Sequence, residues 1–292
     1  MYVVTCLTSP KNPGLDHTLV DSLRAAWGGH QVRWLALNEA AEFTLAEVPS
    51  NRWEVWEDLQ KLGVDLVVQP VEGRRKRMLL ADMDSTMIQQ ECIDELADEA
   101  GVGARVKDIT ARAMNGELDF EGALIERVGL LANLPEAVIA RVLDTRITLM
   151  PGGPELVGTM RANGAYAALV SGGFTAFTRV VAAKLGFDEN RANTLIAENG
   201  ALTGEVGRPI LGRQAKIEAL EQITQRLGIS ESEVIAVGDG ANDLGMLGRA
   251  GTGVALHAKP VVAAECDVRI NFGDLSALLF IQGYARADFV TG

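Results

Sequence analysis

The stretch MLLADMDST, residues 78–86, places two aspartates directly after a short apolar run. The run predicts a buried strand over Met78–Ala81, and open α/β sheets bind their ligands at the carboxyl ends of such strands. Because alternate residues of an extended segment point to the same side, we expect Asp82 and Asp84 to face one spot. Two neighbouring carboxylates repel each other, which raises one pKa and suits a nucleophile beside a general acid. For this motif alone, two solvated aspartates in a turn are the alternative.

A second strand end carries the sequence VGDGAND at residues 237–243. Its glycines permit a tight turn and a close approach of the backbone to a ligand. If a helix begins there, Asp239 and Asp243 lie four residues apart on one face. Carboxylate oxygens are ligands that Mg²⁺ prefers, so the segment is a candidate metal site. An ordinary turn rich in Gly, Asn and Asp is the alternative for this segment on its own.

Two further signals are weak when each is taken alone. Ser171, Gly172 and Gly173 follow an apolar run, and a hydroxyl with free N–H groups at a strand end forms an anion nest. The same three residues also suit a plain turn. Lys216 falls in a predicted helix over residues 213–227, where a lone lysine is most simply a solvated surface residue.

The order of the predicted elements divides the chain into three parts. Residues 1–75 follow the order β-α-β-β-α-β, which is typical of a ferredoxin-like or ACT-like α+β sandwich. Residues 89–147 show helical periodicity and no convincing strand. Strands alternate with helices over residues 76–88 and 148–292, which predicts an α/β core with a parallel, doubly wound sheet.

Local signals mark individual boundaries within these parts. Asp119 is a candidate helix N-cap, and Pro135 is a candidate first residue of another helix. Asn199-Gly200 between two alternating runs predicts a β-hairpin, and a last helix is predicted near residues 275–286. We interpret the basic run Gly73–Arg77 as a solvated linker before a buried strand, rather than as a nucleic-acid patch.

The overall composition excludes several classes of protein. Of the 292 residues, 27 are Lys or Arg and 39 are Asp or Glu, and the net charge of −12 argues against a dedicated nucleic-acid binder. No apolar run approaches the roughly 20 residues of a membrane span, so no membrane partner is expected. Cys6, Cys92 and Cys266 are too scattered for a disulfide framework and indicate a reducing, cytoplasmic location. The P-loop, HExxH and G-x-S-x-G motifs are absent.

The four signals occur in the order DxDST, Ser-Gly-Gly, Lys and GDGxND. This series resembles the haloacid dehalogenase superfamily of phosphotransferases, and more closely its phosphoserine phosphatases. The resemblance covers residues 76–290, and the N-terminal part is similar to the ACT-like accessory domain of longer bacterial members. It implies a Mg²⁺-dependent hydrolysis of O-phospho-L-serine to L-serine and phosphate, the last step of L-serine biosynthesis.

The resemblance also implies roles for the three aspartates nearest the chemistry. Asp82 would be the nucleophile that forms an aspartyl-phosphate, because covalent capture splits one difficult hydrolysis into two easier steps. Asp84 would be the general acid that protonates the leaving serine oxygen, and later the base that activates water. Asp82, Asp239 and the main-chain carbonyl of Asp84 would hold the Mg²⁺ ion.

Five other residues would surround the phosphoryl group by the same resemblance. Ser171 and Lys216 would bind its oxygens, and Gly172 would donate a backbone N–H, so that charge in the transition state is offset. Asn242 would position the phosphoryl group or the water. Asp243 would orient Lys216 or the metal shell.

The helical insertion at residues 89–147 resembles the cap domain of the family, which selects the substrate. Glu91 would bind the substrate ammonium, and Arg127 would clamp its α-carboxylate through paired hydrogen bonds. Met114 and Phe120 would form an apolar wall. Phe120 and Arg127 are seven residues apart, two helical turns, so both can face the site.

Alternatives remain open at the level of substrate and assembly. A related enzyme would act on phosphothreonine, phosphohomoserine or another small phosphomonoester, or would pass the phosphoryl group to an alcohol. One methyl group is worth only about 1–3 kcal/mol in an apolar pocket, so the residues do not separate these substrates. Residues 1–75 are expected to act as a regulatory or assembly module, and a homodimer through this domain is one expectation.

Overall fold

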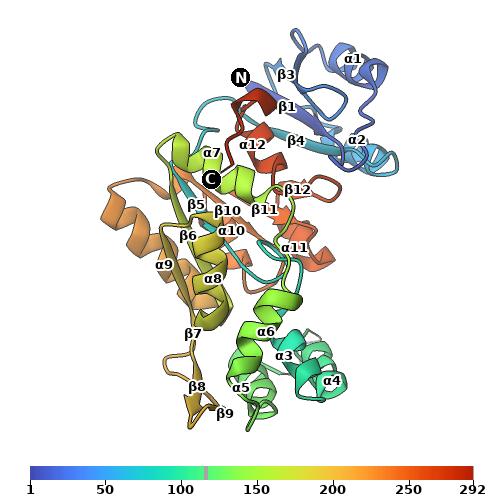
Figure 1. The fold of residues 1–292 in the computed structure, drawn as a ribbon. Coiled ribbons are helices and arrows are strands. Elements are labelled where there is room, and N and C mark those ends of the chain that lie inside the picture. Colours follow the sequence, from blue (N-terminus) through green and yellow to red (C-terminus); the bar gives the residue numbers. More distant parts are fainter. Residues whose placement is uncertain (115–117, 292) are drawn as a thin grey trace.

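The computed structural model describes residues 1–114 and 118–291, the side chains of residues 111, 113 and 114 excepted. We call residues 1–75 the accessory domain, residues 76–88 and 148–292 the core, and residues 89–147 the cap, after the predicted division. Figure 1 shows the small N-terminal sheet at one end of the molecule, the large sheet in the middle and the helical cap at the other end.

The accessory domain is an antiparallel sheet with two helices. Its elements are β1 (Tyr2–Leu7), α1 (His17–Ala26), β2 (Arg33–Ala36), β3 (Ala40–Leu45), α2 (Arg52–Gln60) and β4 (Asp65–Pro70). The strand order is β2-β3-β1-β4, and every neighbouring pair is antiparallel. The predicted ferredoxin-like α+β unit is confirmed. Val4 and Phe43 pack in the cluster beneath the helices, whereas Leu7 and Val67 belong to the apolar cluster of the core.

The core contains a six-stranded, fully parallel sheet in the order β12-β11-β10-β5-β6-β7. Its strands are β5 (Met78–Ala81), β6 (Tyr166–Phe174), β7 (Glu189–Asn193), β10 (Val234–Gly238), β11 (Thr252–Leu256) and β12 (Val268–Ile270). Its helices are α7 (Gly153–Ala162), α8 (Thr175–Leu185), α9 (Arg213–Leu227), α10 (Leu244–Arg249), α11 (Pro260–Glu265) and α12 (Ala277–Ile281). The predicted doubly wound sheet is confirmed.

Alternate residues of the central strand enter two apolar clusters. Leu79 and Ala81 join the cluster that includes residues of α7, α8 and α12, whereas Met78 and Leu80 join the one that includes residues of α9, α10 and α11. A strand buried on both faces reads as an unbroken apolar run, because no side of it meets water. The apolar run of Met78–Ala81 matches this strand, and the first polar residue, Asp82, lies where the strand ends.

The cap is a group of four helices, as the periodicity predicts. They are α3 (Cys92–Glu99), α4 (Gly103–Met114), α5 (Phe120–Gly129) and α6 (Ala137–Thr145). Asp119 caps α5 by accepting a hydrogen bond from the Gly122 N–H at 2.8 Å, which confirms that prediction. The prediction for Pro135 is wrong: α6 begins two residues later, because Pro135 pairs with Ala201 in a short bridge.

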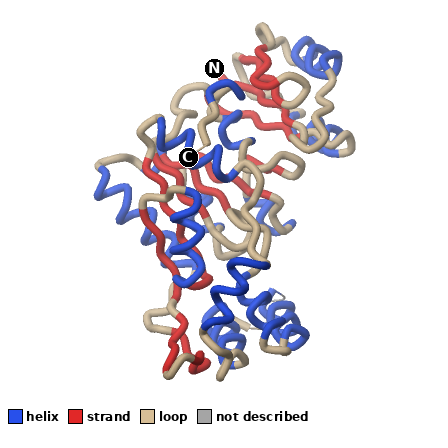
Figure 2. Tube along the Cα trace, in the orientation of Figure 1, coloured by secondary structure: helices blue, strands red, loops and turns tan. Residues whose placement is uncertain are grey.

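That bridge comes from a β-hairpin of the core that reaches the cap. Its strands β8 (Leu195–Glu198) and β9 (Ala201–Val206) flank Asn199-Gly200, both with positive φ, as the sequence predicts. Figure 2 shows the hairpin beside the blue helices of the cap. Leu202 exchanges two backbone hydrogen bonds with the cap, donating to Leu134 at 2.9 Å and accepting from Asn133 at 2.8 Å.

The basic run between the accessory domain and the core is not simply solvated. Arg74 forms an ion pair with the buried Glu42 at 2.6 Å, and its side chain is only 17% exposed. The Arg75 guanidinium lies over the ring of Tyr284, 4.2 Å from its centroid. The run therefore joins the two parts through specific contacts. The expected final helix is shorter than predicted, since α12 ends at Ile281 and a 3₁₀ turn follows at Arg286–Asp288.

Among the helices of residues 1–114 and 118–291, none combines the length and the apolar character that crossing a bilayer requires.

Candidate active site

Asp82 lies at the carboxyl end of β5 and is 5% exposed. Its N–H donates to the carbonyl of Val237 on the neighbouring β10 at 3.0 Å, so the two strand ends are joined there. Oδ1 of Asp82 accepts the N–H of Met83 at 2.8 Å and lies 2.7 Å from Nζ of Lys216. These contacts hold the carboxylate in one orientation.

Lys216 is a buried cation and not a surface residue. It is 1% exposed on the inner face of α9, with Nζ 2.5 Å from Oδ1 of Asp243 and 2.7 Å from Oδ1 of Asp82. Burial lowers the pKa of Lys216, but the charges of Asp243 and Asp82 outweigh it, so the net pKa is raised. The ammonium therefore stays charged between two carboxylates.

Asp243 uses both of its carboxylate oxygens inside the protein. Oδ1 accepts from Lys216, and Oδ2 accepts the N–H groups of Asp239 at 3.1 Å and Gly240 at 2.9 Å. A glycine is needed nearby, because a Cβ built on Gly238 would lie 2.4 Å from Cγ of Asp243. The set of contacts favours a positioning role for Asp243 over a direct bond to a metal.

The two aspartates of VGDGAND meet through a turn and not through a helix. The structure corrects the expected helix start: α10 begins at Leu244, and Asp243 is its N-cap. The Asp243 side chain folds back onto the N–H groups of the turn, so the glycines at 238 and 240 bring its carboxylate beside Asp239. Asp239 also accepts a hydrogen bond from Thr86 Oγ1 at 3.2 Å.

Asp82 and Asp239 offer carboxylate oxygens that fit a divalent cation, and Asp243 lies beside them with both of its oxygens on internal partners. One ligand oxygen from each lies within 4.8 Å of the others, and all three residues are buried. Burial and the charge of Asp243 raise the pKa of Asp82 well above its usual value and raise that of Asp239 to about 6. These carboxylates gather around the Lys216 ammonium, and hard oxygen donors of this kind suit Mg²⁺.

Asp84 and Ser171 connect β5 to β6. Oδ2 of Asp84 accepts from Ser171 Oγ at 3.1 Å, and Oδ1 accepts the N–H of Cys92 at 2.8 Å, where the cap begins. The N–H of Gly173 donates to Ser171 Oγ at 2.8 Å. The expectation that Ser171–Gly173 follow the strand needs correction, because β6 continues to Phe174 with an irregular register after Val170. This irregularity brings the serine hydroxyl to Asp84.

Glu91 and Arg127 bring cap charges to the same place. Glu91 is the N-cap residue of α3, and its Oε1 accepts a hydrogen bond from Ser85 Oγ at 2.6 Å. Burial and the charge of Asp84 raise the pKa of Glu91 to about 7. Burial lowers the pKa of Arg127, and the negative charges of Glu91, Asp94 and Asp84 oppose that change. Arg127 thus interacts electrostatically with both Glu91 and Asp84.

Phe120, at the start of α5, packs on two core glycines. A Cβ built on Gly172 would lie 2.9 Å from Cζ of Phe120, and one on Gly212 would lie 3.0 Å from its Cδ1. The same Gly172 position is 3.9 Å from Nδ2 of Asn242, so ring, glycine and amide lie together. Met114 ends α4, and its side chain lies outside the described part of the chain.

The structure adds Lys259, which sequence reasoning missed. Its N–H donates to the carbonyl of Asp239 at 3.2 Å, and its positive charge lowers the pKa of both Asp239 and Glu91. Lys259 follows β11, the strand next to β10, so its place after an apolar run at 252–256 was the available signal. Its lone position in a polar turn made that signal weak.

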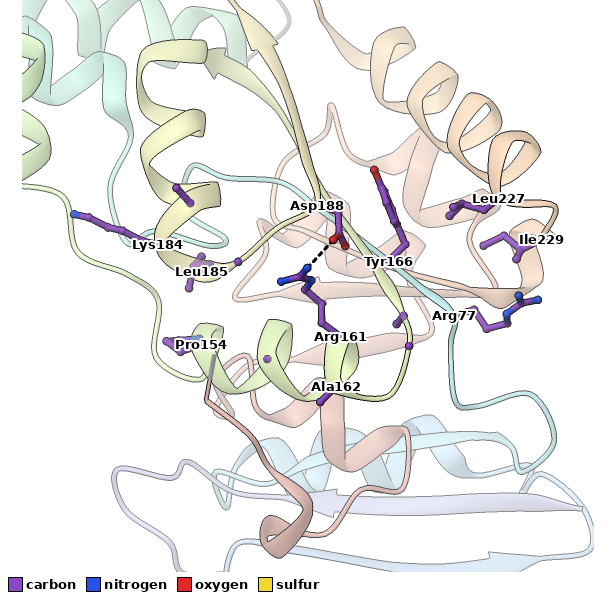
Figure 3. Close-up of a pocket in the computed structure, with 15 residues that line it drawn as sticks. Arg77, Pro154, Arg161, Ala162, Tyr166, Lys184, Leu185, Asp188, Leu227 and Ile229 are labelled. Atoms are coloured by element: carbon purple, nitrogen blue, oxygen red, sulfur yellow. Dashed lines mark hydrogen bonds and ion pairs between the residues drawn. The ribbon is translucent and has the colours of Figure 1, made fainter.

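A separate hollow of about 660 Å³ lies at the opposite edge of the sheet (Figure 3). Residues of α7 and α8 line it together with residues that precede or begin strands, including Arg77, Tyr166 and Asp188. Arg161 forms an ion pair with Asp188 there at 2.8 Å, and Arg77 pairs with Glu233 at 3.1 Å. The hollow contains none of the residues described above, and these charged groups already have partners.

Comparison with known proteins gives the same family as the motifs. The model of the haloacid dehalogenase-like hydrolases matches residues 79–248. A phosphoserine phosphatase of Archaeoglobus fulgidus is 45% identical over 76% of this chain and 64% of its own length. One of Methanocaldococcus jannaschii is 42% identical over 70% of this chain and 97% of its own. The chain spans just under two thirds of the length of the relatives from A. fulgidus and Vibrio cholerae.

Solved structures agree with this result. A haloacid dehalogenase family hydrolase of Salmonella enterica superposes with a TM-score of 0.86 at 32% identity, covering 97% of this chain and 99% of that one. A phospho-aspartyl intermediate analogue of phosphoserine phosphatase has a TM-score of 0.67 at 42% identity and covers 70% and 98%. The Salmonella structure therefore matches this chain along nearly its whole length, including the accessory domain. The phosphoserine phosphatase structure is shorter, and the part of this chain that it matches is about as long as the core and cap together.

Proposed function

Because this chain belongs to the haloacid dehalogenase-like hydrolase family, we propose that it hydrolyses O-phospho-L-serine to L-serine and phosphate. The observation that carries the proposal is the Asp82 carboxylate, held by the buried Lys216, together with the cap residues Glu91 and Arg127, which both interact electrostatically with Asp84. The phosphate ester of an amino acid side chain carries a free ammonium and a free α-carboxylate. A carboxylate can bind the first and a guanidinium the second, and the cap supplies one of each. In the cell this reaction is the last step of L-serine biosynthesis.

In the proposed first step, a carboxylate oxygen of Asp82 attacks phosphorus, and the bond to the serine oxygen breaks. Asp84 gives its proton to that oxygen, which leaves as the serine hydroxyl. In the second step a water attacks the aspartyl-phosphate and gives a proton to Asp84, which frees phosphate and restores Asp82. Lys216, the Ser171 hydroxyl and the Gly172 N–H offset negative charge on the phosphoryl oxygens, and Asn242 positions the group.

We also propose that the carboxylates of Asp82 and Asp239 and the carbonyl of Asp84 hold Mg²⁺. The bound ion would neutralise charge between the nucleophile and the phosphate dianion. Asp243 would keep Lys216 and the turn at 239–240 in place, as its contacts suggest. Phe120, with Met114, would wall off the site from bulk water, which strengthens the electrostatic interactions inside it.

The finer statements on assembly and location are proposals as well. We propose a homodimer through the accessory domain, in which β2 would offer its outer edge, since that strand ends the sheet and Leu37 beside it is 72% exposed. Sedimentation of the full chain as a monomer at all concentrations would reject it. The three cysteines are unpaired and buried, which supports a cytoplasmic location.

Phosphate release tests the activity directly. We expect Mg²⁺-dependent release from O-phospho-L-serine, with much slower release from O-phospho-L-threonine and p-nitrophenyl phosphate, and loss of turnover in Asp82→Asn. Asp58→Asn is the matched control, since Asp58 is exposed and forms a surface ion pair with Lys61 in the accessory domain. Activity confined to the other esters would favour the alternative of a related phosphomonoesterase or phosphotransferase. Near-normal turnover by Asp82→Asn would sink the mechanism.

A further inference from the structure

A carboxylate of the accessory domain is buried inside the core. Asp65, the first residue of β4, is fully buried and accepts three backbone N–H groups from the loop after β12. Oδ1 accepts from Asn271 at 2.8 Å, and Oδ2 accepts from Phe272 at 3.0 Å and Gly273 at 2.8 Å. Three successive N–H groups around one anion form a nest, a strong arrangement for a buried charge. The charge that fills it belongs to another domain.

The loop that Asp65 holds continues the contact toward the candidate active site. The carbonyl of Gly273 accepts a hydrogen bond from His257 Nε2 at 2.7 Å, and the His257 N–H donates to Ile270 at 2.8 Å. His257 has φ of +45°, a conformation that costs free energy and persists only where surrounding contacts enforce it. Two residues later, the Lys259 N–H donates to the carbonyl of Asp239.

The same loop also contacts the segment where the chain returns from the cap. The N–H of Leu275 donates to the carbonyl of Pro151 at 3.1 Å. A Cβ built on Gly152 would lie 2.3 Å from the nitrogen of Ser276, so the two backbones touch. Residues 271–276 therefore contact the accessory domain, His257 in the loop that leads to Lys259, and the cap connection.

We propose that Asp65 is a positioning residue that couples the docking of the accessory domain to the geometry of the metal-binding turn. Without its carboxylate, three N–H groups of the loop lose their acceptor, His257 loses its support, and the contact from Lys259 to Asp239 loosens. The catalytic consequence rests on the proposed function, whereas the structural coupling does not. Coupling between two sites is reciprocal, so a ligand at Asp239 must also stabilise the accessory domain.

Tryptophan fluorescence reports this coupling, because all four tryptophans (Trp27, Trp34, Trp53 and Trp56) lie in the accessory domain. In the full-length wild type, we expect Mg²⁺ to raise the urea midpoint of the fluorescence transition, although the metal site lies in the core. In Asp65→Ala, Mg²⁺ should raise the fluorescence midpoint less than in the wild type, because the apolar packing between the two parts remains but the link through the loop is lost.

Asp267→Ala is the matched control, because it removes a different contact between the same two parts, the 2.9 Å ion pair with Arg52, and leaves the loop intact. We expect its fluorescence response to Mg²⁺ to equal that of the wild type. Hydrogen exchange of the peptide with the Lys259 amide should be faster by about tenfold in Asp65→Ala than in Asp267→Ala. Equal exchange and equal Mg²⁺ responses in the two variants would overturn the proposal.

Kinetics give a readout that a loss of stability alone does not produce. Asp65→Ala should raise the Mg²⁺ concentration for half-maximal phosphatase activity by about fivefold or more. The value for Asp65→Asn, which keeps one acceptor oxygen, should lie between those of the wild type and Asp65→Ala.

If Asp65→Ala does not fold, His257→Ala breaks the next contact and should show the same Mg²⁺ shift. Wild-type behaviour of His257→Ala would reject the coupling. A wild type without phosphatase activity would reject the proposed function, and the exchange comparison would still decide the coupling.

Discussion

Glu91 shows how burial prepares a single side chain for a ligand. Its carboxylate lies at the start of the first cap helix, beside Asp84 and Ser85, with its pKa raised to about 7. An ionised carboxylate in that place has lost water and gained a negative neighbour, and it regains favourable contacts when a cation approaches. The ammonium of an amino acid substrate would be such a cation.

The raised pKa predicts a pH-dependent gain in stability for Glu91→Gln. Below pH 4.5 the carboxyl is protonated in the folded and unfolded states, so it costs nothing. Between pH 4.5 and about 7 the unfolded state releases this proton while the folded state keeps it, so stability falls across that range, and above pH 7 the full cost of the buried charge is present. In metal-free urea unfolding we expect Glu91→Gln to be more stable than wild type by about 1–3 kcal/mol at pH 8 and equal to it at pH 4.

The exposed Glu136, whose side chain makes no capping bond, provides the control Glu136→Gln. Its stability should follow that of the wild type at both pH values. A Glu91→Gln variant that is less stable than wild type at pH 8 would show that the ionised carboxylate is stabilised there.

At the scale of elements, helix α5 of the cap is held against the core by two sets of contacts. The ring of Phe120 packs against Gly172 and Gly212, where a side chain on either glycine would collide with it. The β8–β9 hairpin holds the cap by backbone bonds to residues 133 and 134. Because both contacts involve α5 or the turn after it, the position of this helix relative to the core depends on them.

A methyl group at position 172 tests that packing. Gly172→Ala keeps the backbone N–H but places a Cβ 2.9 Å from Phe120 Cζ, and overpacking of this kind costs about 1–3 kcal/mol. We expect kcat/KM for O-phospho-L-serine to fall about 10–100-fold, since the cap no longer seats. Gly129→Ala, at the end of the same helix with no atom near its Cβ, should leave kcat/KM unchanged. Equal effects of the two changes would contradict this account.

At the scale of the whole molecule, one apolar cluster includes residues of all three parts. Leu7 of the accessory domain, Leu124 of the cap and Leu279 of the core belong to it. The sheet face of the accessory domain opposite its helices therefore meets the core, and Figure 1 shows α12 against β1. Pairing of protomers through that sheet face is excluded by this packing, which leaves the sheet edge for the proposed dimer.

Shared packing predicts that the accessory domain and the core unfold together. Without metal, the urea transition followed by tryptophan fluorescence should coincide with that followed by far-ultraviolet circular dichroism, as in a two-state protein. Fluorescence follows only the accessory domain, whereas circular dichroism follows all helices and strands. A fluorescence midpoint well below the other would mean that the domain separates first and that its interface contributes little.

The sequence alone was enough for the fold class and for placing the aspartates of the candidate site at strand ends. A strand buried on both faces must be an apolar run, and its polar successors must lie at the sheet edge, so Asp82 and Asp239 could be placed from periodicity. Positive-φ residues have local preferences, and Asn199-Gly200 predicted its hairpin for that reason. The order of the four motifs along the chain then added Ser171 and Lys216 to the candidate site, although no local pattern distinguishes these two residues.

Only the tertiary structure decided what these residues contact. The burial of Lys216 depends on which face of α9 packs on the sheet, and the start of α6 depends on a hairpin more than sixty residues away. Lys259 and Asp65 carried no motif, because their partners are backbone groups, which any sequence supplies. Periodicity and turn chemistry are local and can be read along the chain, whereas a hydrogen bond to a distant backbone atom exists only once the domains have packed.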